Sequence, residues 1–219
     1  CLAIDIGTNN ETVLGSEDSI FATSTAAGPA FEGGTIKQGM IAEHGAIQGV
    51  KIENDKIAID VIGNVSPRGI CGSGIIDCTA KLLNAGIIDA SGRIKNRNEV
   101  EGNLANRIRE QGARGKGRDD EQGNAFLLYK DAKKEITITQ KDVREIQLAK
   151  GAIQAGIQLL LKKAQVHSEE IDRVFIAGAF GSNINKQSLA DIGVIENEWL
   201  DRVTFVGDAA LDGARLALC

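Results

Sequence analysis

Apolar and polar positions change their period several times along the chain, and each change marks an expected element. Short apolar runs bounded by Gly, Asn, Asp or Ser predict β-strands. They lie at residues 2–6, 11–14, 20–23, 47–52, 56–61, 136–138, 173–177 and 203–206. The first three form a meander, and Glu53-Asn54-Asp55 closes a hairpin between the next two.

Apolar residues at spacings of three and four predict the helices. Gly72-Ser73-Gly74 opens a helix that reaches about Asn84, and Gly86 is a natural stop. Thr139, with Asp142 three residues on, resembles a capping box at the start of the longest helix. Its buried stripe is expected at Val143, Ile146, Ala149, Ile153, Ile157, Leu160 and Ala164. Shorter helices are expected at 186–192 and 208–218.

This order of elements predicts an α/β fold, in which a three-stranded meander and alternating helices and strands build one mixed sheet with helices on both faces. Two insertions interrupt it, at about 25–65 and 87–135. Residues 25–45 are rich in Gly and Ala, and we expect an irregular segment that holds a short helix. Residues 95–125 are charged and Gly-rich and predict a mobile solvated loop, with a basic binding loop as the alternative.

Composition excludes several classes of partner. The net charge is −5 and aromatics make up 4% of the 219 residues, so neither a basic field nor a base-stacking surface for nucleic acid is expected. No apolar run approaches the roughly 20 residues that span a bilayer. The four cysteines are not spaced as a metal or redox pair, and we expect buried thiols in a reducing cytoplasm. Because the chain opens inside a predicted strand, we expect it to be part of a longer protein.

The first candidate site follows the first strand. Asp5 ends that strand, and Gly7, Thr8 and Asn9 form a tight polar turn. Backbone N–H groups and the Thr8 and Asn9 side chains of such a turn can bind phosphate oxygens, while Asp5 can hold Mg²⁺ or its water shell. An ordinary hairpin is the alternative.

The second candidate is Gly178-Ala179-Phe180-Gly181, where small residues after a buried strand let a ligand approach the backbone. Its glycine spacing fits neither a Rossmann fingerprint nor a P-loop, and a plain tight turn is the alternative. Gly72, Ser73 and Gly74 offer free N–H groups at a helix start, as an anion site or simply as an uncapped end. Gly207-Asp208-Ala209-Ala210-Leu211-Asp212-Gly213-Ala214 suits close helix packing.

Together these motifs resemble the phosphate-2, adenosine and connect-2 motifs of the superfamily of actin, heat-shock chaperones and sugar kinases, which has a ribonuclease H-like fold. A closer resemblance is to the reductive activators of corrinoid proteins. It is carried by Asp5–Asn9, Ala26–Gly34, Gly69–Asp77 and Ile138–Lys150, and leaves only 95–125 outside. Asn10 stands where that branch is expected to have Gly.

The resemblance implies a second ATPase lobe, whose first lobe and N-terminal two-iron ferredoxin-type domain lie elsewhere in the protein. ATP use would drive an electron from that cluster to a Co(II) corrinoid protein. ATP would bind between the lobes, with Asp5 at Mg²⁺, Gly7–Asn9 at the phosphates and Gly178–Gly181 beside adenosine; Glu32 is a candidate for facing the cleft. One lobe alone should bind and hydrolyse ATP poorly, and its open faces can pair two copies. Alternatives are a dehydratase activator, a small-molecule kinase or a non-catalytic interaction module.

Overall fold

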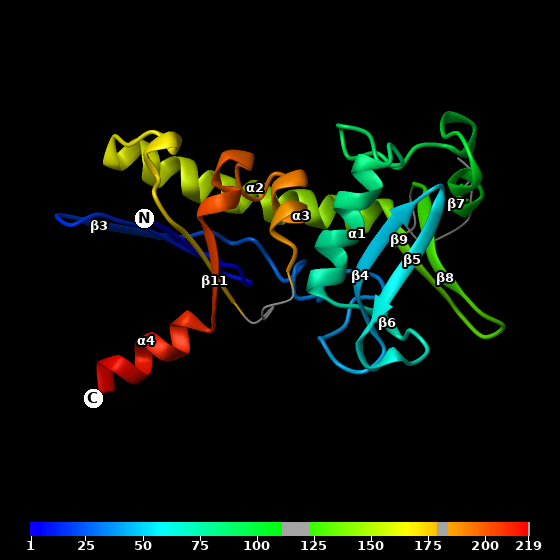
Figure 1. Ribbon diagram of the computed structural model, residues 1–219, viewed down its shortest axis with the longest axis horizontal. Helices are drawn as coiled ribbons and strands as arrows, with labels where there is room; N and C mark the ends of the chain where they lie inside the picture. Colours follow the sequence, from blue (N-terminus) through cyan, green and yellow to red (C-terminus); the bar gives the residue numbers. More distant parts are fainter. Residues whose placement is uncertain (111–122, 179–183, 219) are drawn as a thin grey trace.

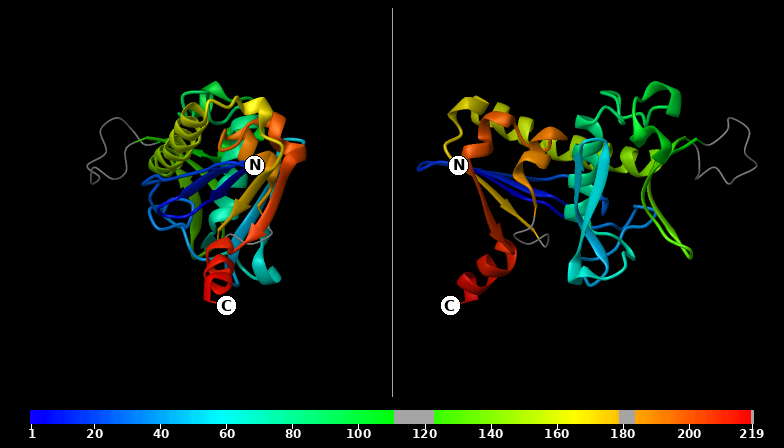
Figure 2. Two further views of the ribbon diagram at one scale, coloured as in Figure 1. Left: turned by 90° about the vertical axis from the view of Figure 1, so that its left-hand side faces the viewer. Right: turned by 45° about the vertical axis from the view of Figure 1, so that its right-hand side comes forward.

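The computed structural model describes residues 1–110, 123–178 and 184–218, and it divides into two bodies joined side by side (Figure 1). One body is a five-stranded sheet beneath the long helix α2 (Gln140–Ala164). The other gathers two three-stranded sheets around α1 (Gly72–Asn84). The right-hand view of Figure 2 separates the two bodies most clearly.

The five-stranded sheet has the order β11-β10-β1-β2-β3. Its strands are β1 (Leu2–Asp5), β2 (Glu11–Gly15), β3 (Ile20–Ser24), β10 (Val174–Ala177) and β11 (Val203–Gly207). Strand β1 pairs in parallel with β10 and antiparallel with β2, and β10 pairs in parallel with β11. This is the expected mixed sheet, built from a meander and two later strands.

The second body holds the sheets β5-β4-β6 and β7-β8-β9. Their strands are β4 (Ala46–Glu53), β5 (Lys56–Val61), β6 (Gly69–Ile70), β7 (Ile108–Arg109), β8 (Ala125–Lys130) and β9 (Glu135–Thr139). Asn54 and Asp55 adopt positive φ angles of 48° and 60° at the β4–β5 turn, which confirms the predicted hairpin. Strands β6, β7 and β8 were not predicted.

The remaining helices are short. They are α3 (Lys186–Asp191), α4 (Ala209–Leu218) and the 3₁₀ helices Ile62–Asn64, Arg97–Glu99, Asn103–Arg107, Ser168–Glu170 and Asn197–Arg202. The predicted stripe of α2 is confirmed, since all of its members except the partly buried Ala164 belong to the core. Gly156 lets α2 lie close to the sheet, because a Cβ there would come within 3.0 Å of Thr25.

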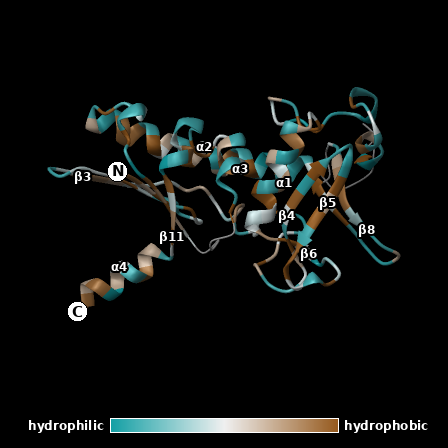
Figure 3. Ribbon diagram, in the orientation of Figure 1, coloured by the Kyte–Doolittle hydropathy of each residue, from teal (hydrophilic) through white to brown (hydrophobic). Residues whose placement is uncertain are grey.

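Among the described residues, helices cover only one face of the five-stranded sheet, against the prediction of helices on both faces. The other face carries a row of cross-strand neighbours that are at least partly exposed: Ala22, Val13, Ala3, Phe175 and Thr204. Helix α4 does not cover them, because it projects away from the body with every residue exposed. Its apolar residues, including Leu216 and Leu218, therefore face solvent (Figure 3).

The insertions also differ from expectation. No helix forms within 25–45; the backbone runs through turns around Pro29–Ile36 instead. Within 95–125, residues 97–110 are structured: Asp55, at the hairpin turn, accepts hydrogen bonds from the backbone N–H groups of Asn103 and Leu104. Residues 111–122 lie outside the described part.

A buried carboxylate ties the first insertion to the start of α2. Asp142 is 1% exposed and accepts hydrogen bonds from Thr139 N and Thr139 Oγ1, both at 2.8 Å, which completes the predicted capping box. Its second oxygen accepts the backbone N–H of Lys37 at 2.8 Å. One side chain thus caps a helix and anchors a segment 105 positions earlier.

Asp142→Ala should lower the free energy of unfolding by about 3 kcal/mol, because it removes a helix cap and leaves a buried N–H group unsatisfied. Glu145→Ala, one turn further along α2, should cost less than about 0.5 kcal/mol. Chemical denaturation of both variants measures the difference. Equal losses would show that the three bonds of Asp142 add nothing to stability.

Candidate functional site

Three parallel strands end together at one edge of the five-stranded sheet. Asp5 ends β1, Gly178 follows β10 and Gly207 ends β11. The ends are tied by backbone hydrogen bonds, from Ile6 N to Ala177 O at 3.0 Å and from Gly178 N to Gly207 O at 3.0 Å. In open α/β sheets, ligands bind outside the carboxyl ends of the parallel strands.

Gly178 brings the first two predicted motifs into contact. Its φ is +123°, and a Cβ atom there would overlap the carbonyl oxygen of Ile6 and come within 3.3 Å of Asp5 Oδ1. Only glycine fits between these strand ends, because any side chain would collide with the backbone of Ile6. The predicted residues Ala179, Phe180 and Gly181 lie outside the described residues.

The turn after β1 is held by the segment that follows β3. Thr8 donates its backbone N–H to Glu32 Oε1 at 2.8 Å and its hydroxyl to Glu32 Oε2 at 3.0 Å. Gly28 N donates to Thr8 O at 3.0 Å, and Thr25 N donates to Asn9 O at 2.9 Å. The side chains of Thr8 and Glu32 are exposed, so the predicted phosphate turn faces solvent with Glu32 beside it.

The backbone conformation at residue 10 explains why Asn stands there. Its φ is +46°, a left-handed conformation that Gly and Asn adopt most readily, which accounts for Asn where the resemblance suggested Gly. The side chain is fully buried and donates to Thr25 Oγ1 at 3.2 Å. Asn10 therefore faces the interior under α2, while Gly7, Thr8 and Asn9 face outward.

Asp5 lies among other carboxylates. Burial raises the pKa of its carboxyl above the ordinary value, and the negative charges of Glu11 and Asp208 raise the pKa further. Among the described residues, no group of three or more His, Cys, Asp or Glu forms a ready metal cluster. Mg²⁺ commonly uses one or two carboxylates and completes its shell with water and phosphate. Asp5, with Asp208 or Glu11 near it, fits that donor set.

The start of α1 is more enclosed than the turn. Gly72, Ser73 and Gly74 are all buried, and Cys71 provides no side-chain cap. A Cβ atom at Gly74 would overlap the carbonyl oxygen of Ile47 in β4, so this glycine allows the helix to pack on the sheet. Packing accounts for Gly74, and the anion-binding role of this helix start stays a prediction.

The cysteines divide between surface and core. Cys1 is exposed, against expectation, whereas Cys71 and Cys78 are buried. Burial raises the pKa of the Cys78 thiol well above its usual range, so it stays protonated and unreactive. Cys219 lies outside the described residues.

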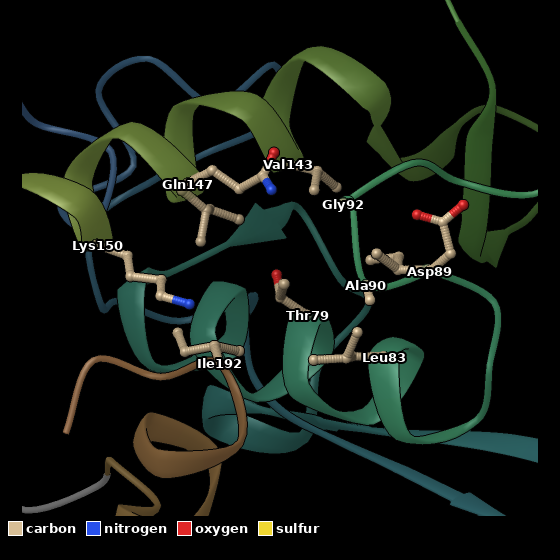
Figure 4. A pocket seen from close by; sticks show the side chains of 11 residues that line it. Thr79, Leu83, Asp89, Ala90, Gly92, Val143, Gln147, Lys150 and Ile192 are labelled. Carbon is tan, nitrogen blue, oxygen red and sulfur yellow. The ribbon is translucent and has the colours of Figure 1, made fainter. Parts of the chain in front are cut away.

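A separate pocket lies between α1 and α2. Thr79 and Leu83 of α1, Val143, Gln147 and Lys150 of α2, and Ile192 line it (Figure 4). The carboxamide of Gln147 is already bonded to Ser91 O at 3.1 Å. The pocket runs along the C-terminal half of α1, away from the helix start, and contains none of the predicted site residues.

A family model described as the C-terminal domain of RACo, the ASKHA domain, matches residues 1–219. The chain belongs to this family. The resemblance to reductive activators and the predicted fold class are thereby confirmed. Among the described residues, no helix has the length and hydrophobicity that a membrane span requires.

Relatives of this ASKHA domain are named for corrinoid chemistry. The corrinoid activation enzyme RamQ of Eubacterium limosum is 37% identical over 222 residues, which cover 99% of the chain and 36% of that protein. The Co(II) methylated amine-specific corrinoid protein reductase of Methanosarcina barkeri is 27% identical over 236 residues, which cover 98% and 38%.

The solved structure of a protein described as a reductive activator for corrinoid, iron-sulfur protein is also similar to this chain, with a TM-score of 0.85 and 41% identity. The match covers 99% of this chain and 33% of that protein's chain. The chain therefore spans roughly a third of the length of the relatives it matches.

Gly178→Ala should destabilise the ASKHA domain by more than about 2 kcal/mol, because the new methyl group meets backbone at a φ that disfavours it. Gly151→Ala, in α2 with open space around it, should instead stabilise by about 0.5–1 kcal/mol. Thermal denaturation of the two variants gives opposite shifts. A neutral Gly178→Ala would contradict the close approach of β1 and β10.

Asp5→Asn should stabilise the ligand-free domain at neutral pH. The pKa of Asp5 is raised by folding, so its ionised form is penalised in the folded state at pH values above that folded pKa. The gain should shrink as the pH falls through the folded pKa, and it should vanish only below the unfolded value near 3.8, where the carboxyl becomes protonated in both states. The melting temperature of Asp5→Asn should therefore exceed that of the wild type at pH 7, and the difference should be smaller at pH 4. Melting curves at pH 7 and pH 4, with Asp18→Asn as control, test this; a loss at pH 7 would contradict it.

Proposed function

We propose that this ASKHA domain is the ATP-binding lobe of a reductive activator, which uses ATP to drive an electron from an iron–sulfur cluster to the cobalt of a Co(II) corrinoid protein. The observation that carries the proposal is the close approach of Gly178 to the backbone of Ile6 and to the Asp5 carboxylate. It joins the two motifs that the ATP site of the superfamily requires, in a chain whose relatives are named as corrinoid activators.

The proposed roles follow from the surroundings of each residue. Gly7, Thr8 and Asn9 form an outward-facing turn whose N–H and hydroxyl groups suit phosphate oxygens. Asp5 is the carboxylate best placed for Mg²⁺, which would balance the charge of the phosphates and of Glu11 and Asp208. Gly178 lies at the strand end next to Asp5, on the side of the site that the resemblance gives to adenosine.

This lobe provides one side of the site, and the other side belongs to the rest of the protein. Hydrolysis needs a positioned water and charge around the γ-phosphate, which an open sheet edge does not enclose. We place the first lobe and the iron–sulfur domain outside residues 1–219. The described cysteines do not suit a cluster, since Cys71 and Cys78 are buried in and beside α1 while Cys1 is exposed.

Asp5→Asn in the full-length protein should reduce ATP-stimulated corrinoid reduction at least 100-fold, to the rate without ATP, because the site loses the carboxylate proposed for Mg²⁺. The assay follows the absorbance of the corrinoid partner from Co(II) to Co(I) with a fixed reductant. Asp18→Asn, in the exposed turn between β2 and β3, serves as the matched control.

Two outcomes would contradict the proposal. Unchanged stimulation in Asp5→Asn would remove Asp5 from the site. Absence of any ATP stimulation in the wild-type protein, with ATP consumed on another substrate, would favour a kinase or a dehydratase activator. Circular dichroism of each variant confirms that the fold is intact.

A further inference from the structure

Glu32 already occupies donors that the proposed site offers to phosphate. Both of its oxygens are used, one by the N–H and the other by the hydroxyl of Thr8, at 2.8 and 3.0 Å. A Cβ atom at Gly7 would lie 3.4 Å from the same carboxylate, so Glu32 sits directly against the turn. A carboxylate and a phosphate oxygen accept the same hydrogen bonds, so they compete for Thr8.

The backbone around Glu32 is fixed although its side chain is exposed. Ala30 and Phe31 are 2% exposed, and Glu32 N and Gly34 N both donate to Pro29 O, at 3.1 and 2.9 Å. A Cβ atom at Gly33 would lie 2.9 Å from Met40 N, so the turn packs closely on the following chain. The turn therefore presents one carboxylate at a set position, and only side-chain rotation is needed to move it away.

We infer that Glu32 is an internal competitor for the phosphate site, which closes the Gly7–Asn9 turn in the absence of nucleotide and must rotate away when phosphate binds. This inference rests on the proposed function, because it assumes that the turn binds phosphate. The two negatively charged groups cannot share the donors of Thr8, so one must leave when the other binds.

The closed turn reduces the observed affinity for nucleotide. When the competent form is a fraction of the population, the apparent dissociation constant rises by the inverse of that fraction. Two charge-assisted hydrogen bonds from an exposed side chain can favour the closed turn enough that the turn is open in only about one molecule in ten. Removing the carboxylate should therefore tighten ATP binding about tenfold.

The test compares Glu32→Ala with Glu17→Ala in the full-length protein. Glu17 lies in the exposed turn at the far end of β2, so its loss changes the net charge equally without touching the phosphate turn. Calorimetry with ATP and Mg²⁺ should show about tenfold tighter binding for Glu32→Ala and no change for Glu17→Ala. Binding of adenosine, which carries no phosphate, should be the same in all three proteins.

Glu32→Gln provides a second variant that keeps the size of the side chain. It can still accept a neutral hydrogen bond from Thr8, so its gain should be smaller, about two- to fivefold. Unchanged or weaker ATP binding in both variants, with wild-type binding intact and lost in Asp5→Asn, would overturn this inference and leave the proposed function standing. If no protein binds ATP, the proposed function fails and this inference fails with it.

Discussion

The close approach of β1 and β10 is the constraint on which the site depends. Strand β1 lies between an antiparallel and a parallel neighbour, so its end cannot move without breaking pairing on both sides. At that end the chain leaves β10 through Gly178, which fits because it has no Cβ to meet Ile6 O. Thr8, in the turn proposed for phosphate, and Gly178, at the start of the turn proposed for adenosine, are 170 positions apart in sequence. The pairing of β1 with β10, rather than side chains, brings the ends of these strands together.

Hydrogen bonds from side chains fix other parts of the fold relative to one another. Asp77 of α1 accepts hydrogen bonds from Val50 N of β4 at 2.7 Å and from Ser188 Oγ of α3 at 2.6 Å, and so joins these three elements. Gln38 extends the edge of β9: its carboxamide donates to Glu135 O at 2.6 Å and accepts Thr137 N at 2.7 Å. The bonds of Asp77 fix α1 relative to β4 and α3, and those of Gln38 fix the first insertion relative to β9.

Local patterns predicted most of this fold, and contacts between distant residues explain most of what was missed. The Thr139–Asp142 capping box and the stripe of α2 are encoded within a few turns of helix, so the sequence was enough. Strand β8 was missed because its apolar run, Ala125–Tyr129, follows a charged Gly-rich stretch that predicted a loop. Glu32 was recognised only as a candidate, since nothing near it in sequence identifies Thr8 as its partner, 24 positions away.

The carboxylates around the candidate site repel anions when no ligand is bound. Glu11 and Asp208 add negative charge near Asp5, and the N–H and hydroxyl of Thr8 are bonded to Glu32. A free phosphate or carboxylate entering this edge would meet repulsion from every one of these groups. A nucleotide whose phosphates are already paired with Mg²⁺ brings positive charge toward Asp5 and can exchange with Glu32 at Thr8. The site would then select Mg²⁺-bound nucleotide over free anions because it repels the free anions, rather than because it attracts ATP more strongly.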